Sequence, residues 1–445
     1  MMNVVGKKIV VLGLGESGME VAKLLKKFGA DVLIRDNGSS AKHQARAEAM
    51  RQEGIAVEIG SEVKSTANFD FGVLSPGIDP SVPLVQTLTQ ARLPLMGELE
   101  MAFRFCECPI VAITGTNGKT TTTELVAALL TAGEKRTMAS GNIGKAFSAA
   151  VAKSAELDVM VLEVSSFQLE CTVDFRPRVS VHLNLTPDHL DRYATMEEYR
   201  AAKWEIYKNQ TPDDFAIVNV DVELPKNFRA QKITFSAFGK PADYQLIDGM
   251  LTARGEPVVA LDKTNLVGPH NAENLLAALA VADLYNVPRQ AAIEAMCNYV
   301  PQPHRCEKVG VVNGVTYLND SKATNIDALE KALLAMRAPV VLIAGGKDKG
   351  LDFSGLRPLL REKVREIVLL GQMKDKFYDW WHSAVPCHKV ETLNDAVDAA
   401  QRLARSGDVV LFSPGCSSYD MFSSYVERGD LFRSAVQAKL STPNK

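Results

Sequence analysis

Short apolar runs alternate with amphipathic stretches along most of this chain. The runs at residues 111–114, 159–162 and 340–344 consist almost wholly of aliphatic side chains. Runs of this length without charged positions are typical of parallel strands that are covered on both faces. Between them, apolar residues recur every three or four positions, which is the spacing of one face of a helix. The pattern predicts an α/β fold in which strands and helices alternate.

The same pattern divides the chain into three parts. The first set of strand and helix signals stops at Gly97, before the second half of a doubly wound domain could form. Two prolines, Pro301 and Pro303, mark a linker before strand and helix signals begin to alternate again. A chain of 445 residues is also too long for a single hydrophobic core. The predicted domains span residues 1–97, 98–302 and 303–445.

A glycine turn follows the strand at residues 111–114 and leads into a helix. Its backbone N–H groups can surround phosphate oxygens, and Lys119 adds a positive charge. The Thr120 hydroxyl stands where it can hold Mg²⁺. A standard phosphate loop has glycine where Ile113 stands, so this loop is a shortened variant. We predict nucleotide binding, and the alternative is an ordinary turn with a solvated lysine. The predicted phosphate-binding residues are Gly115, Thr116, Asn117, Gly118, Lys119, Thr120 and Thr121.

A second glycine loop lies near the N-terminus. Gly13, Gly15 and Gly18 follow a strand, and Asp36 ends the next strand about 20 positions later. This spacing is the fingerprint of a loop that holds a nucleotide diphosphate while the carboxylate binds a ribose. Because the segment is short, we predict a diphosphate such as that of a UDP-sugar, with NAD as the alternative.

Two polar residues of the middle part suggest a metal site. Glu163 interrupts an apolar strand, and a buried carboxylate is costly unless it is paired or binds a metal. It can face Mg²⁺ because parallel strands bring their carboxyl ends to one edge of the sheet; a buried ion pair is the alternative. His189, in a polar loop, is a second candidate ligand, whereas His182 lies inside a strand and is expected to be a core histidine. Lys203, on a helix, is by composition only a solvated charge.

Another helix begins near residue 268. Asn271 and Asn274 share one face of its first turn, where their amides can reach a base or ribose. Capping of the helix by Asn271 is an equally good interpretation.

Composition excludes several classes of protein. The 50 Lys and Arg residues against 53 Asp and Glu give no basic surface for nucleic acid. Seven cysteines, an odd number, suit reduced thiols, and Cys106 and Cys108 lack partners that would complete a metal site. No apolar run reaches about 18 residues. We expect a soluble, cytoplasmic protein and a monomer, with no nucleic-acid or membrane partner.

Together these residues resemble the Mur ligase family, the amino-acid-adding enzymes of peptidoglycan synthesis, nearly from end to end. Their joint occurrence in this order is far more specific than any one of them. The motifs are Gly115-Thr-Asn-Gly-Lys-Thr120, Glu163-Val-Ser-Ser-Phe-Gln-Leu169, Asn184-Leu-Thr-Pro-Asp-His-Leu-Asp-Arg-Tyr193, Tyr199-Arg-Ala-Ala-Lys203, His270-Asn271, Pro303-His-Arg305, Asn319-Asp-Ser-Lys-Ala-Thr-Asn325 and Ser413-Pro-Gly-Cys-Ser-Ser418.

The resemblance implies an N-terminal Rossmann-like UDP-binding domain, a central P-loop ATPase-like domain and a C-terminal Rossmann-like domain that binds the amino acid. It implies ATP and two Mg²⁺ ions as cofactors, and Lys119, Lys203, His189 and Glu163 as catalytic residues. Thr120, Glu163, His189 and a carbamylated Lys203 would form the metal sites. Further ATP contacts would come from Asn271, Arg305 and Asp320. UDP-substrate contacts would come from Gly15, Ser17, Asp36, Ser75, Gly77 and Asn142. Amino-acid contacts would come from Lys322, Thr324, Lys349, Ser418 and Tyr425.

The implied reaction adds D-glutamate to UDP-N-acetylmuramoyl-L-alanine through an acyl phosphate. D-glutamate is preferred because the Asp-Asn-Pro-Arg motif of the diaminopimelate-adding relatives is absent. Tyr425 stands where Phe is expected, Gly415 where Ala is usual, and Glu16-Ser17 where a Leu-Thr pair is common. The alternatives are an L-alanine-adding ligase, a folylpolyglutamate-synthetase-like enzyme, an NAD-dependent oxidoreductase and a nucleotide-gated binding protein without turnover.

Overall fold

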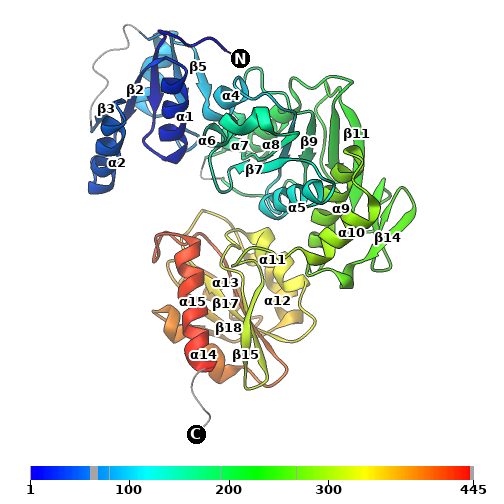
Figure 1. Ribbon diagram of the computed structural model, residues 1–445. Helices are drawn as coiled ribbons and strands as arrows, with labels where there is room; N and C mark the ends of the chain where they lie inside the picture. The colour runs from blue at the N-terminus through cyan, green and yellow to red at the C-terminus, as the bar shows by residue number, and fades with distance from the viewer. Residues whose placement is uncertain (1, 61–68, 80, 191, 267, 441–445) are drawn as a thin grey trace. The chain divides into compact units, whose positions relative to one another are not determined.

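The computed structural model describes residues 2–60, 69–79, 81–190, 192–266 and 268–440. These described residues form three β-sheets of five, nine and six strands, with helices in the connections (Figure 1). It divides into two compact units. The first unit comprises Met1–Asn184, Tyr199–Val259 and Glu273–Met296, and the second comprises Leu185–Glu198, Ala260–Ala272 and Cys297–Lys445. The first unit contains two of the sheets and the second contains the third.

The first sheet is parallel, with the strand order β3-β2-β1-β4-β5. The order reverses at β1, which pairs with both β2 and β4, so the glycine loop after β1 lies at the switch point where α/β sheets bind ligands. The strands are β1 (Lys8–Leu12), β2 (Asp31–Asp36), β3 (Ala56–Ile59), β4 (Phe71–Leu74) and β5 (Leu95–Gly97), and the helices are α1 (Glu16–Lys27), α2 (Ala41–Gln52) and α3 (Pro83–Gln90).

The second sheet carries the phosphate loop at its own switch point. Strand β6 pairs in parallel with β8 on one side and β9 on the other, in the order β14-β13-β12-β11-β10-β9-β6-β8-β7. The strands are β6 (Ile110–Thr114), β7 (Thr137–Gly141), β8 (Val159–Glu163), β9 (Val179–His182), β10 (Phe215–Asn219), β11 (Gln231–Ser236), β12 (Tyr244–Ile247), β13 (Met250–Ala253) and β14 (Glu256–Ala260). The helices are α4 (Glu98–Phe103), α5 (Lys119–Ala132), α6 (Phe147–Ala150), α7 (Ser166–Leu169), α8 (Met196–Trp204), α9 (Pro269–Leu284) and α10 (Arg289–Asn298).

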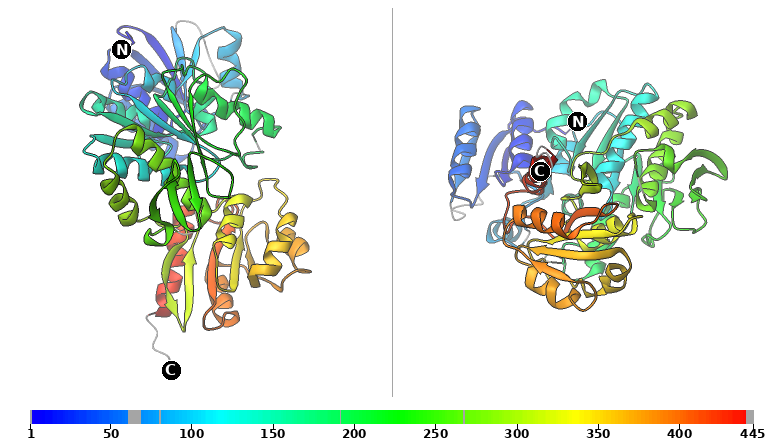
Figure 2. Two further views of the ribbon diagram at one scale, coloured as in Figure 1. Left: turned by 90° about the vertical axis from the view of Figure 1, so that its right-hand side faces the viewer. Right: turned by 90° about the horizontal axis from the view of Figure 1, so that it is seen from below.

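The third sheet confirms the predicted alternation in the last part of the chain. Its order is β15-β16-β20-β17-β18-β19, in which β15 and β16 form an antiparallel hairpin and the other pairs are parallel. Helix α15 lies along β15 (Figures 1 and 2). The strands are β15 (Glu307–Val312), β16 (Val315–Asn319), β17 (Val340–Gly345), β18 (Val364–Leu370), β19 (Cys387–Lys389) and β20 (Val409–Gly415). The helices are α11 (Ile326–Leu334), α12 (Arg357–Lys363), α13 (Lys374–Trp381), α14 (Leu393–Leu403) and α15 (Tyr425–Leu440).

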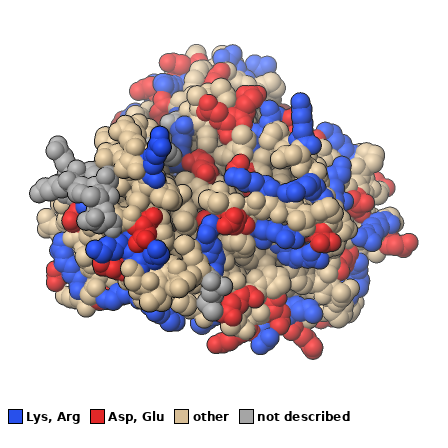
Figure 3. All heavy atoms as spheres, turned by 90° about the horizontal axis from the view of Figure 1, so that it is seen from above, with Lys and Arg blue, Asp and Glu red and all other residues tan. Residues whose placement is uncertain are grey.

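The apolar runs seen in the sequence form the cores of these sheets. Every residue of β6, β8 and β17 is buried, as expected for central parallel strands covered on both faces. On the face shown in Figure 3, Lys and Arg side chains are interspersed with Asp and Glu, which agrees with the balanced charge of the sequence. Among the described residues no helix has the length and apolar character needed to cross a membrane.

Candidate active site

The phosphate loop is held by two asparagines that lie far from it in sequence. The Asn184 Oδ1 atom accepts hydrogen bonds from the backbone N–H groups of Thr116 and Asn117, at 3.0 and 2.9 Å. Gly118 has a φ of +82°, and a Cβ atom there would lie 2.3 Å from the Asn274 Oδ1 atom. Glycine is therefore required at this position by both its backbone conformation and its packing. The loop has a fixed shape that turns the chain into α5.

Two lysines converge on one carbonyl oxygen of this loop. The Lys119 Nζ atom donates to the carbonyl oxygens of Gly115 and Thr116, at 3.0 and 2.8 Å. The Lys203 Nζ atom donates to the same Gly115 oxygen at 2.9 Å and lies 4.7 Å from the ring centroid of Tyr199. Lys203 is only 1% exposed, so it is not the solvated charge that composition suggested. Burial and a neighbouring like charge both disfavour an ammonium group at this point.

Glu163 ends strand β8 beside the loop. Its strand pairs with β6 so that Glu163 lies opposite Ile113. The side chain is 3% exposed, and its Oε1 atom accepts a hydrogen bond of 2.8 Å from the Asn142 side-chain amide. Among the described residues the Oε2 atom has no hydrogen-bond partner. A buried carboxylate oxygen without a hydrogen-bond partner is better explained by coordination of a metal ion than by an ordinary ion pair with a side chain.

His182 lies at the end of β9, opposite Thr114 of β6. It is fully buried, and its Nδ1 atom is 3.0 Å from the Tyr207 hydroxyl. Burial lowers the pKa of His182 to about 3, so the ring is neutral. This environment matches the expected core histidine, although Nε2 lacks a hydrogen-bond partner within the described part of the chain.

The residues at this edge of the second sheet suit a Mg²⁺ ion that is bound together with the phosphates of a nucleotide. The described residues contain no group of three or more His, Cys, Asp or Glu side chains that could hold a metal by itself. Mg²⁺ usually takes one or two carboxylates, substrate phosphates and several waters. Glu163 provides the carboxylate, and Thr120 lies in the first turn of α5 directly after Lys119. The donor set therefore suits Mg²⁺ that arrives with a nucleotide.

His189 belongs to the second unit, whereas Glu163 and Lys203 belong to the first. It has a φ of +55°, and its neighbour Asp188 organises its loop. The Asp188 carboxylate accepts hydrogen bonds from the Asn325 amide at 2.9 Å and from Lys349 at 3.2 Å. Burial would raise the pKa of Asp188, but the charge of Lys349 and these hydrogen bonds hold it below its ordinary value. Lys349, expected to contact the amino acid, is therefore engaged by Asp188.

Asn271 is not the cap of its helix. Helix α9 begins at Pro269, a residue suited to the first helical position because it has no N–H to donate. Asn271 thus lies inside the first turn, which removes the capping interpretation. Asn274, on the first unit's side of the division, is buried and accepts a hydrogen bond of 3.1 Å from the Thr122 hydroxyl.

Asp320, directly after β16, links β20 and the start of β15 through hydrogen bonds. Its carboxylate accepts hydrogen bonds from the Ser413 hydroxyl at 2.8 Å and from the Cys306 backbone N–H at 3.2 Å. Burial raises the pKa of Asp320 to about 7, although these hydrogen bonds and the charge of Arg305 oppose the shift. Arg305 itself is half-buried, next to Cys306.

Two residues expected at the amino acid, Lys322 and Tyr425, lie against each other. The Lys322 Nζ atom is 3.9 Å from the ring centroid of Tyr425. Arg428, a buried residue of α15 that sequence reasoning did not identify, joins the loop that carries Lys322 to the turn after β20. Its guanidinium donates to the carbonyl oxygens of Ser321 and Cys416, at 2.6 and 3.0 Å.

Two other residues expected at the amino acid follow the carboxyl ends of β16 and β20, which are neighbouring parallel strands. Ser418 is buried in the turn after β20, and its carbonyl oxygen accepts hydrogen bonds from Met421 and Phe422. Thr324 is half-buried in the connection from β16 to α11. Within the described structure, neither the Ser418 nor the Thr324 side chain forms a hydrogen bond to another protein group.

At the first glycine loop, Asp36 supports the loop itself. Its carboxylate accepts hydrogen bonds from the backbone N–H groups of Leu14 at 2.6 Å and Gly38 at 2.7 Å. A Cβ atom on Gly18 would lie 2.0 Å from the Gly13 carbonyl oxygen, whereas one on Gly15 would meet nothing within 4 Å. Gly15 therefore faces open space, as approach of a diphosphate to the backbone requires.

The remaining residues expected at the UDP-substrate are spread over both sheets of the first unit. Ser75 is buried and donates a hydrogen bond of 3.5 Å to the Gly13 carbonyl oxygen. Ser17 is half-buried in the first turn of α1, and Gly77 is exposed. Asn142, through its amide contact with Glu163, connects this set with the expected metal site.

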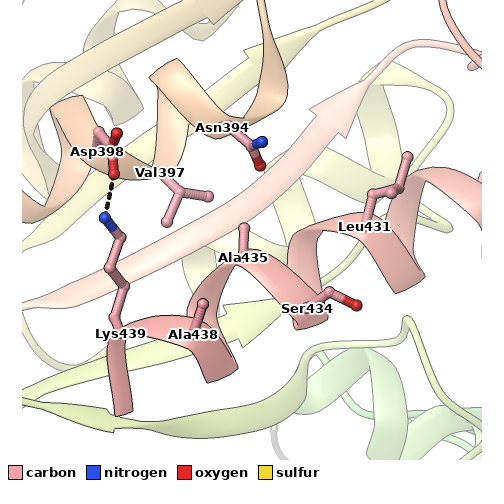
Figure 4. A pocket seen from close by; sticks show the side chains of 8 residues that line it. All are labelled: Asn394, Val397, Asp398, Leu431, Ser434, Ala435, Ala438 and Lys439. Carbon is pink, nitrogen blue, oxygen red and sulfur yellow. Dashed lines mark hydrogen bonds and ion pairs between the residues drawn. The ribbon is translucent and has the colours of Figure 1, made fainter. Parts of the chain in front are cut away.

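The structure also contains a hollow of about 450 Å³ on the surface of α14 and α15. Asp398 and Lys439 form an ion pair at one side of it (Figure 4). None of the expected site residues lines this hollow. Its lining residues are Asn394, Val397, Asp398, Leu431, Ser434, Ala435, Ala438 and Lys439.

Comparisons with known proteins cover almost the whole chain. Family models match three segments: "Mur ligase MurD-like, N-terminal domain" at residues 7–97, "Mur ligase middle domain" at 113–282 and "Mur ligase, glutamate ligase domain" at 304–416. The chain belongs to the Mur ligase family. Members of this family are ATP-dependent ligases that form amide bonds, so the NAD-dependent oxidoreductase alternative has no support.

Several Mur ligases are similar to this chain over their full length. A protein of Pelotomaculum thermopropionicum is 40% identical over 446 residues, with 97% of each chain covered. One of Alkaliphilus metalliredigens is 38% identical over 451 residues, with 98% of this chain and 99% of the relative covered. Both are named "UDP-N-acetylmuramoylalanine--D-glutamate ligase".

Solved Mur ligases share the fold. The UDP-N-acetylmuramate-alanine ligase MurC of Thermotoga maritima matches with a TM-score of 0.62 at 20% identity, covering 97% of this chain and 99% of its own. The MurF ligase of the same organism matches with a TM-score of 0.60 at 16% identity, covering 98% and 96%. The three-domain α/β architecture predicted from the sequence is thereby confirmed.

Proposed function

We propose that this Mur ligase adds D-glutamate to UDP-N-acetylmuramoyl-L-alanine with hydrolysis of ATP to ADP and phosphate. The observation that carries the proposal is the pair Lys119 and Lys203 on the Gly115 carbonyl oxygen, at the strand edge that ends in Glu163. The names of relatives that are 38–40% identical over nearly the full chain support D-glutamate as the amino acid.

In the first step the loop holds the ATP phosphates. The backbone N–H groups of residues 115–118 and the Lys119 ammonium bind the phosphate oxygens and neutralise charge that develops as the γ-phosphoryl group is transferred. The carboxylate of UDP-N-acetylmuramoyl-L-alanine attacks that phosphorus, which forms an acyl phosphate and releases ADP. Bound Mg²⁺ would supply further neutralisation of phosphate charge, held by Thr120 and Glu163.

In the second step the amine of D-glutamate attacks the acyl phosphate. The resulting tetrahedral intermediate collapses with loss of phosphate and leaves an amide. Lys322, Thr324, Lys349, Ser418 and Tyr425 are the proposed contacts for D-glutamate. Water must be excluded because an acyl phosphate hydrolyses, and closure of the C-terminal domain on the middle domain would exclude it.

We further propose that Lys203 carries a carbamate. A carbamate forms when a neutral amine takes up CO₂, and the burial of Lys203 beside Lys119 favours the neutral amine. The modification turns a cation into an oxygen ligand suited to a hard metal ion. With His189 and Glu163 it would hold a second Mg²⁺.

The other assignments complete this proposal. Asn271, Arg305 and Asp320 would contact the adenine, ribose and phosphates of ATP. The UDP-substrate would lie at Gly15, Ser17, Asp36, Ser75, Gly77 and Asn142. The domain boundaries would fall at residues 97–98 and 302–303, and the enzyme would act as a monomer in the cytoplasm, where its nucleotide substrates are made.

One assay tests the proposal directly. Phosphate release is measured with ATP, Mg²⁺ and UDP-N-acetylmuramoyl-L-alanine against a panel of D- and L-amino acids. D-glutamate alone should give rapid release together with a new amide product. Release with UDP-N-acetylmuramate and L-alanine, or with a folate substrate and L-glutamate, would instead support one of the two ligase alternatives. ATP binding without release under any condition would support the binding-protein alternative.

A further inference from the structure

Cys106 and Cys108 lie between helix α4 and strand β6, outside the proposed ligase machinery. Their Sγ atoms are 3.9 Å apart, and both residues are half-buried. The Cys106 Sγ atom is also 3.4 Å from the carbonyl oxygen of Cys108. Two thiols in this arrangement are close enough to share a proton and accessible enough to meet a small reagent.

The two thiols differ in acidity because they are coupled. A hydrogen bond from Cys108 stabilises the Cys106 thiolate and lowers the pKa of Cys106 to about 7, against the effects of burial and of the nearby Glu107 charge. The same hydrogen bond and burial raise the pKa of Cys108. Tyr285 is a further titratable side chain that interacts with Cys108. Near neutral pH one sulfur is a nucleophile and the other remains a thiol.

The backbone around the pair can accommodate a closer approach. Helix α4 ends at Phe103 and β6 begins at Ile110, so neither cysteine belongs to a helix or a strand. The segment is anchored on either side of Cys106, because the Phe105 ring packs 4.5 Å from that of Phe28 and the Glu107 N–H donates to the Ser154 hydroxyl at 3.1 Å. Bond formation requires the sulfurs to move roughly 2 Å closer, which a loop can do without breaking strand pairing.

We propose that Cys106 and Cys108 are a modification site at which a peroxide, such as hydrogen peroxide, forms a reversible disulfide. The Cys106 thiolate attacks one peroxide oxygen, the O–O bond breaks, and hydroxide leaves, which gives a sulfenic acid. The Cys108 sulfur then attacks the Cys106 sulfur, the S–O bond breaks, and the Cys108 proton leaves with hydroxide as water. In total, two thiols lose two electrons and two protons while one peroxide becomes two waters.

The disulfide should be readily reduced. Its ring spans a single intervening residue, and strained or exposed disulfides have the more oxidising potentials of labile bonds. Closing so short a loop also removes little chain entropy from the unfolded state. The disulfide would therefore form reversibly under oxidising conditions and would add little to the stability of the fold.

The test uses the full-length reduced protein, hydrogen peroxide and mass spectrometry with peptide mapping. Wild type should lose two hydrogens in the peptide that contains both cysteines, and dithiothreitol should restore them. Cys108→Ser should instead accumulate a Cys106 sulfenic acid, trapped by dimedone, because its resolving thiol is gone. Cys387→Ser is the matched control, since Cys387 is also half-buried but burial raises its pKa to about 11.

Two results would overturn the proposal. One is equal dimedone trapping in wild type and Cys108→Ser, which would show that Cys108 does not resolve the intermediate. The other comes from wild type alone and does not depend on any variant folding. Iodoacetamide should label Cys106 at pH 7 on the order of 100-fold faster than Cys387, with half-maximal rate near pH 7. Equal rates at the two cysteines would contradict the coupled thiolate.

Discussion

Lys119 and Lys203 donate hydrogen bonds to the same backbone oxygen, that of Gly115. One lysine belongs to the phosphate loop and the other to α8, so the loop and this helix are fixed against each other. Two ammonium groups that share one acceptor repel each other. The buried Lys203 gives up its proton more easily, because water does not stabilise its charged form. The arrangement gives a physical reason for a chemically modified lysine at this edge of the sheet.

If Lys203 carries the proposed carbamate, Lys203→Ala should lower ligase turnover by about 100-fold or more, because the proposed oxygen ligand for Mg²⁺ would be lost. Formate or acetate should restore part of the activity by entering the vacated space. Lys208→Ala is the matched control, since Lys208 is exposed and paired with Glu205. The prediction fails if no carboxylate rescues the variant and the intact wild-type protein shows no CO₂ adduct under bicarbonate.

Lys119→Ala should remove ligase turnover and leave the fold intact. The lysine is half-buried on the loop and donates to the carbonyl oxygens of Gly115 and Thr116, so we expect the variant to lose mainly the positive charge at the phosphates. Steady-state turnover and circular dichroism measure the two parts of this prediction. Lys153→Ala, at an exposed position of the same domain, should keep wild-type turnover. A Lys119→Ala enzyme of normal rate would refute the assignment of the loop.

Gly15→Val and Gly18→Ala should behave in opposite ways. The Gly15 side chain would project into open space from an ordinary φ of −75°, so the variant should fold and bind ATP but lose the UDP-substrate. The Gly18 side chain would collide with the Gly13 carbonyl oxygen, so even alanine should destabilise the first sheet. Calorimetric titration with each nucleotide and thermal unfolding separate these outcomes. Equal loss of both ligands in Gly15→Val would argue against two separate sites.

Arg428→Met should raise the KM for D-glutamate by about tenfold or more, with a smaller effect on the KM for ATP. The change leaves the carbonyl oxygens of Ser321 and Cys416 buried without their donor, which costs about 1–3 kcal/mol for each and loosens both loops. Arg433→Met, on the same helix but paired with Glu307, should not change the KM for D-glutamate. An equal rise in both KM values would indicate general destabilisation instead.

Asp320 should make the third sheet less stable as pH rises. Its folded pKa of about 7 lies above its ordinary value of 3.8, so the folded chain holds a proton that the unfolded chain releases between these values. The free energy of unfolding should therefore fall from about pH 4 to about pH 7, by on the order of 1 kcal/mol per pH unit.

This slope can be measured by urea unfolding in a Trp204→Phe background, where the remaining Trp380 and Trp381 report on the third sheet. Asp320→Asn should flatten the slope, because an amide does not titrate. Asp379→Asn, at an exposed position on α13, is the control and should leave it unchanged. Identical slopes in the parent and Asp320→Asn would contradict the protonated carboxyl.

The sequence predicted those features that local pattern determines. Strands such as β17 and β20 were visible because fully buried strands need uninterrupted apolar runs, and the phosphate loop because its glycines and lysine are adjacent. The burial of Lys203 and Arg428 was not visible, since it depends on packing between segments far apart in the chain. Asp36 was expected to bind a ribose, and only the fold reveals its hydrogen bond to Leu14.

The contact of Asn274 with the phosphate loop has a consequence for how the enzyme is made. Thr122 and Asn274, whose side chains are hydrogen-bonded, are 152 positions apart in the chain. Contacts between residues this far apart form late in folding, because the chain must lose the entropy of closing a long loop before the contact can stabilise the fold. During synthesis Asn184 emerges soon after the loop that it holds, whereas the support from Asn274 is missing until the ribosome has released α9, so the complete loop environment forms only after that point.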